Sequence, residues 1–267
     1  MRISVTPLPP SGLSARAVRA GCRKGSFTGP TSGQAYGMVQ ANLMILPAAY
    51  ADDFYRFCEL NPKPCPLIEV LQPGEVEPRA APGADIRSDL PQYRLYRDGK
   101  LESEPGDIRG EWRGDLVTFL IGCSFSFEEA LLAAGVPLRH LELKRNVPMY
   151  RTNIACQSAG RFSGPLVVSM RPLPQSLVEK ATEITARCAK VHGAPVHVGS
   201  PESIGIASLQ HPDYGDAVPL EAGEVPVFWA CGVTPQAVVA ASAIPFCITH
   251  APGKMFVTDL KNEDFAE

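Results

Sequence analysis

The sequence predicts an α/β fold that carries an inserted, smaller α+β domain. Near the C-terminus, two apolar runs at residues 225–230 and 246–249 flank an apolar helix at 234–243, which is typical of a βαβ unit. Earlier in the chain, an apolar strand at 116–121 leads through a Gly-Cys-Ser turn into another helix. The block at 136–200 differs from both, because it shows strands with few helices.

These observations predict the domain organisation. A chain of 267 residues is long enough for one large domain or two ordinary ones. We expect residues 1–135 and 201–267 to form one discontinuous α/β domain around a single parallel sheet. Residues 136–200 would then form the inserted α+β domain.

Composition and charge favour a globular protein with a small-molecule ligand. Apolar residues make up 45% of the chain and charged residues 20%, as in folded proteins. The net charge of −3 and the scattered basic residues argue against nucleic acid or an anionic membrane as a partner. No apolar run approaches the roughly 20 residues that cross a bilayer, and the first residues lack the apolar core of a signal peptide. We therefore expect a cytoplasmic protein, with a homo-oligomer left open.

The cysteines predict reduced, mostly buried thiols. None of them forms a CxxC pair, and a cytosolic protein keeps its thiols reduced. The eight are Cys22, Cys58, Cys65, Cys123, Cys156, Cys188, Cys231 and Cys247.

The N-terminal part begins with a short helix at 14–24, followed by a strand at 36–46. Gln40 and Asn42 lie two residues apart in this strand, so they share one face of it. Two amides inside an apolar strand must find partners. They bond either to neighbouring backbone or to a ligand, and Asn42 is a candidate substrate-binding residue.

The next stretch predicts an amphipathic helix, a short strand and a hairpin around Asp98-Gly99. These elements span 48–61, 67–71, and 93–97 with 100–102. Asp85, Arg87 and Asp89 cluster in a turn-rich loop before the hairpin. Such a cluster is either a solvated loop or a lid over a site.

The turn after the strand at 116–121 is a candidate anion site. A strand, a Gly-containing turn and a helix N-terminus present backbone N–H groups, which favour a carboxylate. We expect the helix at 128–134 with Ser126 as its N-cap, which leaves Ser124 to contact a ligand. The turn lacks the motifs of the common phosphate-binding loops.

The block at 136–200 contributes arginines to the candidate site. Its predicted strands are 139–144, 146–155, 165–170 and 196–198, and its predicted helix is 174–188. Arg151 and Asn153 lie in one strand, and Arg171 ends a neighbouring one. A guanidinium fork suits a carboxylate ligand, although a lone arginine also pairs with surface acids.

The C-terminal unit supplies the candidate catalytic residues. Ligands of open α/β sheets bind at the carboxyl ends of strands, where Cys231, Thr234, His250 and Asp259 are expected. His250 could serve as acid and base because histidine titrates near neutrality, and Asp259 could orient it. Cys231 is a nucleophile only if a histidine lies within hydrogen-bond reach. Packing is the alternative role of both Cys231 and His250.

The histidine spacings do not predict a metal site. His192 and His197 lie five residues apart, and His250 precedes Asp259 by nine. Neither spacing matches a zinc-binding helix or finger. We expect no intrinsic metal and no cofactor.

Long segments of the chain resemble the D-glutamate cyclase family, which is grouped with the hydro-lyases. They include FTGPTSGQAYGMVQANLMILP, RFCELNPKPCPLIEV, APGADIRSDLPQYRLYRDG, FLIGCSFSFEEALL, NVPMYRTNIAC, GPLVVSMRP, HGAPVHVG, VPVFWACGVTPQ and ITHAPGKMFVTD. The resemblance covers residues 14–260 and implies a three-layer α/β domain with a smaller α+β domain. The reaction that it implies is closure of D-glutamate to 5-oxo-D-proline with release of water.

This reaction assigns hypothetical roles to the candidate residues. Arg151 or Arg171 would anchor the α-carboxylate, and the turn at Ser124 or the helix start at Thr234 would stabilise the oxyanion. His250 would move the protons, supported by Asp259. The alternatives are a hydro-lyase acting on another small hydroxy or amino acid, and a protein that binds a small molecule without turnover. In each case the polar residues should converge on one hollow.

Overall fold

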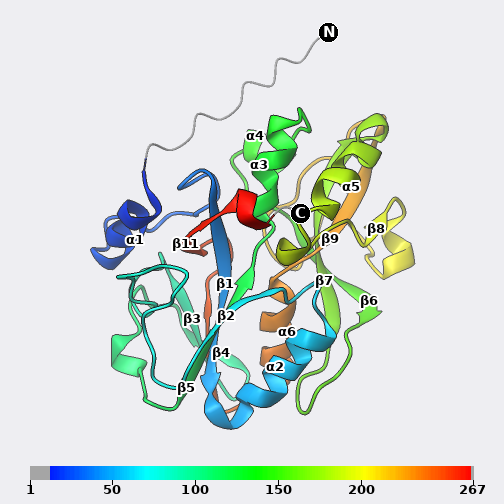
Figure 1. The fold of residues 1–267 in the computed structure, drawn as a ribbon. Coiled ribbons are helices and arrows are strands. Elements are labelled where there is room, and N and C mark those ends of the chain that lie inside the picture. The colour runs from blue at the N-terminus through cyan, green and yellow to red at the C-terminus, as the bar shows by residue number, and fades with distance from the viewer. Residues whose placement is uncertain (1–12, 266–267) are drawn as a thin grey trace.

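The protein, described here from a computed structural model, folds into two antiparallel sheets that lie side by side (Figure 1). The structure describes residues 13–265. The first 12 and the last two residues, which the sequence assigns to the outer α/β domain, lie outside the described residues.

The larger sheet is built around β1, whose two edges are both paired. One edge pairs with β5, and the other pairs with β11 along its first half and with β10 further on. The strand order is β2-β5-β1-β10-β3-β4, and β11 adjoins β1. The strands are β1 (Met38–Pro47), β2 (Leu67–Leu71), β3 (Tyr93–Arg97), β4 (Lys100–Ser103), β5 (Leu116–Gly122), β10 (Phe246–His250) and β11 (Phe256–Lys261).

The smaller sheet has the order β6-β7-β9-β8. Its long central pair runs from Val168 opposite Ala230 to Pro174 opposite Glu224. The strands are β6 (Met149–Ala155), β7 (Pro165–Pro174), β8 (His197–Val198) and β9 (Glu224–Ala230).

Helices cover one face of each sheet. In Figure 1, α2 and α6 lie between the two sheets, and α3 and α4 lie at the top. Apolar residues of α2 and α6 pack on the larger sheet, and those of α3 and α5 pack on the smaller one. The helices are α1 (Ala15–Arg23), α2 (Ala51–Leu60), α3 (Phe125–Ala133), α4 (Arg139–Glu142), α5 (Val178–Ala186) and α6 (Val233–Ala241).

Aromatic packing joins the two sheets. Phe162, from the connection between β6 and β7, lies edge-on against Phe54 of α2, with ring centroids 5.2 Å apart. Phe54 in turn lies edge-on against Phe119 of β5 at 4.9 Å. Edge-to-face pairs of this kind contribute about 0.5–1.5 kcal/mol beyond their burial. The hairpin of the smaller sheet is thereby anchored in the core of the larger one.

The predicted βαβ unit and its parallel sheet are wrong. The strands β9 and β10 belong to different sheets, and the helix α6 between them crosses from the smaller sheet to the larger. Every strand pair among the described residues is antiparallel. Apolar periodicity identifies strands and helices but does not specify a strand's partners. The division of the chain into domains stays a prediction.

Three local predictions are also wrong. Residues 139–144, expected as a strand, contain the helix α4, which at four residues is too short to show helical periodicity. The N-cap of α3 is Ser124 and not Ser126. The N-cap of α6 is Gly232, which places Thr234 inside the helix.

A buried histidine holds the connection after α5 against the end of β5. His192 has a left-handed backbone with φ of 89°, and its Nδ1 lies 2.8 Å from the carbonyl oxygen of Lys63. Burial lowers the pKa of His192 from 6.5 to about 4, so the ring stays neutral in the folded protein at neutral pH.

We expect the free energy of unfolding to fall as the pH drops from 6.5 to 4. In this range the unfolded His192 binds a proton that the folded one does not, which corresponds to about 3 kcal/mol at most. His192→Asn keeps a side-chain N–H for Lys63 and tolerates the left-handed backbone, so it should remove the contribution of His192 and make this dependence shallower. Urea unfolding at pH 7 and pH 5 measures the free energy of unfolding at each pH, and the exposed His211→Asn is the control. Equal pH dependence in His192→Asn and the unmodified protein would contradict the assignment.

Candidate functional site

Three strands end around one hollow, which we call the Asn42 hollow. On β1, Ala41 pairs with Gly122 at the end of β5, and Met44 pairs with Thr249 near the end of β10. The carboxyl ends of β5 and β10 therefore flank Asn42, and the end of β9 reaches the same place from the smaller sheet. The hollow is lined by Asn42, Cys123, Ser124, Phe125, Asn146, Val147, Met149, Cys231, Gly232, Val233, His250, Gly253 and Met255.

The hollow is small. It holds about 330 Å³ of empty space, open solvent included.

Two helix N-termini converge on the Asn42 hollow. The residues that line it include the N-caps of α3 and α6, Ser124 and Gly232, together with the first helical residue after each. The side chain of Ser124 does not cap α3 by a hydrogen bond, and Gly232 has no side chain that could cap α6. The first backbone N–H groups of a helix lack intrahelical partners, and they carry the positive end of the helix dipole. Because no lysine or arginine is among the described lining residues, these helix ends supply the positive potential.

Asn42 connects the two turns that start these helices. Its Nδ2 donates to the carbonyl oxygen of Gly122 at 2.7 Å. On the other side, a Cβ added at Gly232 would lie 2.0 Å from the same Nδ2. Only glycine therefore fits at position 232 while Asn42 holds the first turn.

His250 is buried and neutral at the end of β10. It is 1% exposed, and burial lowers its pKa to about 4. The backbone N–H of Leu43 donates to Nδ1 at 3.0 Å, which leaves the ring proton on Nε2. The amide nitrogen of Gln236 lies 3.1 Å from both ring nitrogens, and as a donor it cannot accept the Nε2 proton. The ring can therefore donate a hydrogen bond from Nε2 at neutral pH.

Cys231 and Cys123 occupy equivalent places, each just before a helix start. Burial raises the pKa of Cys231 to about 11 and also raises the pKa of Cys123. Both side chains are therefore neutral thiols at neutral pH. The described hydrogen bonds of the His250 ring go to Leu43 and Gln236, so the structure does not pair His250 with Cys231 as a base with its nucleophile.

Arg171 lies behind Ser124 and does not line the Asn42 hollow. It is 0% exposed, and its guanidinium packs against the neighbouring rings of Phe127 and Trp229, at 5.3 and 5.4 Å from their centroids. It donates to Ser124 Oγ at 3.2 Å and to the carboxylate of Glu128. With its donors engaged inside the protein, Arg171 is not placed to bind a substrate carboxylate directly.

The carboxylate of Glu128 is the counterion of Arg171. His140 also faces it, with Nε2 3.1 Å from Oε1 but out of line for a hydrogen bond. Burial alone would raise the pKa of Glu128, but the neighbouring His140 and Arg171 outweigh it and lower the pKa to about 2. Glu128 is therefore ionised throughout the physiological range.

Arg151 and Asn153 lie on the exposed side of β6, outside the Asn42 hollow. Arg151 packs on the ring of Tyr214 at 5.7 Å, and its Nη2 donates to the tyrosine hydroxyl at 2.9 Å. Asn153 packs against Gly205. The sequence places both on a strand but does not show that this strand is an edge.

Thr234 and Asp259 also serve structural contacts. Thr234 Oγ1 accepts from the backbone nitrogen of Val167 and donates to its carbonyl oxygen, so it ties α6 to β7. Asp259, within β11, forms an ion pair with Arg19 of α1 at 2.8 Å. Of the residues predicted for the site, the structure brings Asn42, Ser124, Cys231 and His250 to the hollow.

Cys123, Asn146 and Gly232 line the hollow but were missed by the sequence-based reasoning. One signal was available, since a strand followed by Cys and then a helix occurs twice, at GCSF and ACGV. Asn146 follows no regular element and gives no such signal.

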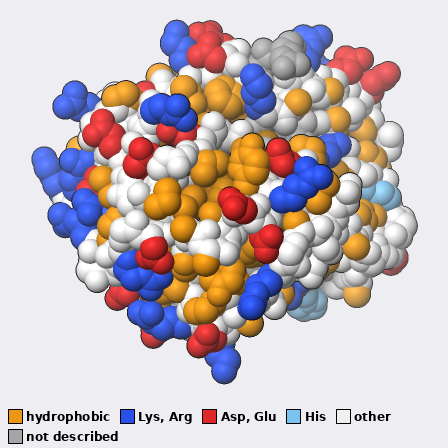
Figure 2. All heavy atoms as spheres, turned by 60° about the horizontal axis from the view of Figure 1, so that its bottom comes forward, with side chains coloured by type: hydrophobic (Ala, Val, Ile, Leu, Met, Phe, Trp, Pro, Cys, Tyr) orange, Lys and Arg blue, Asp and Glu red, His pale blue; other side chains and the backbone are white. Residues whose placement is uncertain are grey.

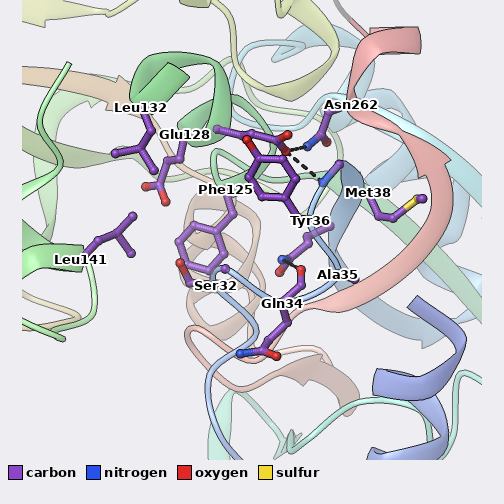
Figure 3. Close-up of a pocket in the computed structure, with 14 residues that line it drawn as sticks. Ser32, Gln34, Ala35, Tyr36, Met38, Phe125, Glu128, Leu132, Leu141 and Asn262 are labelled. Carbon is purple, nitrogen blue, oxygen red and sulfur yellow. Dashed lines mark hydrogen bonds between the residues drawn. The ribbon is translucent and has the colours of Figure 1, made fainter. Parts of the chain in front are cut away.

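A second hollow, which we call the Gln40 hollow, lies against α3 (Figure 3). It holds about 530 Å³ of empty space, open solvent included, and Phe125 lines both hollows. Its lining residues are Ser32, Gly33, Gln34, Ala35, Tyr36, Gly37, Met38, Gln40, Phe125, Glu128, Glu129, Leu132, Leu141 and Asn262.

Three further observations concern the surface, metal ions and membranes. On the face in Figure 2, acidic and basic side chains are interspersed with apolar ones. Among the described residues, no three His, Cys, Asp or Glu side chains gather where they could hold a metal ion. In the same part of the chain, no helix has both the length and the apolar character to span a bilayer.

A family model and several named relatives match this chain, and their descriptions agree with each other. Residues 117–259 match the sequence model of the family described as D-glutamate cyclase. A protein of Stutzerimonas stutzeri named "Putative hydro-lyase" is 61% identical over 94% of this chain and 95% of its own. A relative of that same description from Bordetella pertussis is 63% identical over 93% of this chain and 90% of its own. Another, from Rhodopseudomonas palustris, is 59% identical over 95% of this chain and 93% of its own.

Solved structures add no argument. A nitrogen repressor-like protein from Methanococcus jannaschii covers 88% of this chain and 91% of its own. Its sequence identity is 12% and its TM-score is 0.37. A likeness at this level says nothing about function.

Arg171→Met should destabilise the protein by about 3–5 kcal/mol, because it leaves the Glu128 carboxylate buried without its main counterion. Glu128→Gln should also be costly, since it leaves the guanidinium unpaired. The double variant should lose less stability than the sum of the two single variants. Urea unfolding measures this coupling, and Arg56→Met, in an exposed ion pair with Glu59, is the control. Additive losses would show that the two side chains do not interact.

Gly232→Ala should cost about 1–3 kcal/mol, because the new methyl group displaces the Asn42 amide from the Gly122 carbonyl. Thermal unfolding measures the loss. Gly29→Ala is the matched control, because nothing lies within 4 Å of a Cβ added there. If both variants melt at the same temperature, the contact between Gly232 and Asn42 is not tight.

Proposed function

The chain belongs to the D-glutamate cyclase family, and from this premise we propose that it cyclises D-glutamate to 5-oxo-D-proline in the Asn42 hollow. The names of its relatives supply the general class, a hydro-lyase that breaks a carbon–oxygen bond and releases water. The observation that carries the proposal is the convergence of two helix N-termini on one small hollow.

Two helix N-termini suit a substrate with two carboxylate groups. Both carboxyl groups of glutamate are ionised at neutral pH, since such groups have pKa values of about 4 or lower. One carboxylate would meet the N-terminus of α3, at Ser124 and Phe125. The other would meet that of α6, at Gly232 and Val233. This arrangement replaces the arginine anchors expected from the sequence.

The substrate itself supplies the oxygen atom and both protons of the water that is released. The ammonium nitrogen loses a proton and attacks the side-chain carboxyl carbon, so a C–N bond forms and closes a five-membered ring. A second proton leaves the nitrogen, the C–O bond breaks, and the departing oxygen carries both protons away as water. Because the attack is intramolecular, much of the entropic barrier is already removed.

The helix ends and His250 would stabilise the tetrahedral intermediate. Its oxyanion would lie against backbone N–H groups that are fixed before the reaction. His250 would act as a neutral donor through Nε2, since Nδ1 accepts from Leu43 and the ring is not protonated near pH 7. Cys123 and Cys231, as neutral thiols, would line the hollow without repelling the carboxylates.

Binding without turnover is the second candidate function. It is favoured by one observation, since both thiols and the His250 ring that line the hollow are neutral at neutral pH. In that case the helix ends would hold a small carboxylate and no bond would break.

The purified protein should convert D-glutamate, and not L-glutamate, to 5-oxoproline, which NMR detects directly. His250→Gln should lower kcat by about 10²–10³-fold, as expected for loss of one oxyanion donor, and should change KM little. Glutamine can still accept from the Leu43 N–H, so the fold should persist. The exposed His211→Gln is the control.

Three other outcomes are informative. Undiminished turnover by His250→Gln would remove His250 from the mechanism. Thermal stabilisation by D-glutamate without 5-oxoproline would support the binding function. Loss of water from another hydroxy or amino acid, with no reaction of glutamate, would support a different hydro-lyase.

A further inference from the structure

Gln40 brings an unpaired acceptor to the Gln40 hollow. It is 4% exposed, and its Nε2 donates to the carbonyl oxygens of Thr31 at 2.8 Å and Gln34 at 3.3 Å. Carbonyl oxygens only accept, so these bonds fix which end of the amide is nitrogen. The buried Oε1 has no hydrogen-bond partner among the described residues.

Asn262 brings a second unpaired acceptor to the same hollow. Its Nδ2 donates to Glu129 Oε2 at 3.0 Å, and a carboxylate also only accepts, which fixes this amide as well. Its buried Oδ1 has no partner in the described part of the chain. A buried polar atom without a partner costs about 1–3 kcal/mol, so two in one hollow indicate a missing donor.

The charge in the hollow comes from Glu129. Its Oε2 accepts from the backbone of Gly37 at 3.0 Å and from Asn262, and it forms no ion pair with any described basic side chain. Glu128 lines the hollow too, but Arg171 balances its charge. Burial and the charge of Glu129 raise the pKa of Tyr36, which agrees with a negative potential here.

One wall of the hollow is mainly apolar. Figure 3 shows Phe125, Leu132 and Leu141 on the side of α3 and α4, with Glu128 among them, opposite Tyr36 and Asn262. An occupant therefore meets acceptors and the unbalanced charge of Glu129 at one end, and at the other hydrocarbon beside the Glu128 carboxylate, whose charge Arg171 balances.

We propose that the Gln40 hollow binds a primary ammonium group carried on a short apolar chain. An ammonium has three donors and no acceptor, which matches the two free amide oxygens and the Glu129 carboxylate. Its charge offsets that of Glu129, and its chain lies along the leucines. A water molecule would satisfy the oxygens but not the charge. A hard divalent ion prefers a shell of oxygens, and the mainly apolar wall does not provide one.

This site is separate from the one proposed for the reaction. The Asn42 hollow attracts anions through helix ends, whereas the Gln40 hollow attracts a cation through acceptors. Binding of a ligand at the Gln40 hollow therefore does not depend on whether the protein cyclises glutamate.

The test is an NMR titration of the full chain with n-butylammonium and, in parallel, with n-butanol. The ammonium should bind at least about tenfold more tightly than the alcohol, because charge-assisted hydrogen bonds are the stronger kind. Nuclear Overhauser contacts should connect its methylene protons to the methyl groups of Leu132 and Leu141. Equal affinity for the alcohol, or contacts to other methyl groups only, would overturn the proposal.

Variants sharpen the test. Glu129→Gln should weaken n-butylammonium binding about tenfold or more, and Gln40→Met should weaken it less, since only a neutral acceptor is lost. The exposed Glu59→Gln, on α2, should leave it unchanged. Undiminished binding by Glu129→Gln, in a protein that still melts cooperatively, would overturn the proposal. The contacts in the unmodified protein decide the matter if either variant fails to fold.

Discussion

The buried ion pair between Arg171 and Glu128 is the constraint around which the two sheets are arranged. Arg171 comes from β7 in the smaller sheet, and Glu128 comes from α3, which continues β5 of the larger sheet. Removing both charges from water is expensive, and it is tolerated because the rings of Phe127 and Trp229 pack against the guanidinium while hydroxyl groups take its remaining donors. The pair therefore fixes α3, and with it Ser124, relative to the smaller sheet. Both hollows reach that helix start at Phe125, and the two have opposite electrostatic preferences.

Much of the secondary structure was predictable, because most elements have a clear apolar pattern. The strand around Asn42, the hairpin at Asp98-Gly99 and the helix α6 all follow from periodicity and turn residues. The pairing of strands did not follow, since β9 looks as apolar as a strand of a parallel sheet. What the sequence does not show is that α6 connects two sheets. That connection depends on contacts between residues far apart in the chain, such as those of Phe54 with Phe162.

The candidate site was predictable where a local rule sufficed. Ser124 and Cys231 were predicted as site residues because each lies in a turn between a strand and a helix. His250 was predicted because it lies at the end of a strand. The rule about strand ends still applied although the sheets are antiparallel, because three strands end at the same place. Arginines could not be placed in this way. The side chain of Arg171 is long enough to point into the core, and only the aromatic rings and Glu128 around it explain why it does.

The pairing around β1 has one more consequence. The edge of β1 changes partner from β11 to β10 beside Leu43, and there a backbone N–H bonds to an imidazole nitrogen instead of a carbonyl oxygen. The magnetic environment of this amide proton depends on the charge and tilt of the His250 ring. In a heteronuclear spectrum, the Leu43 signal is thus a built-in reporter for the Asn42 hollow. It would register an arriving molecule whatever its identity, with no label on that molecule and no chemical step required.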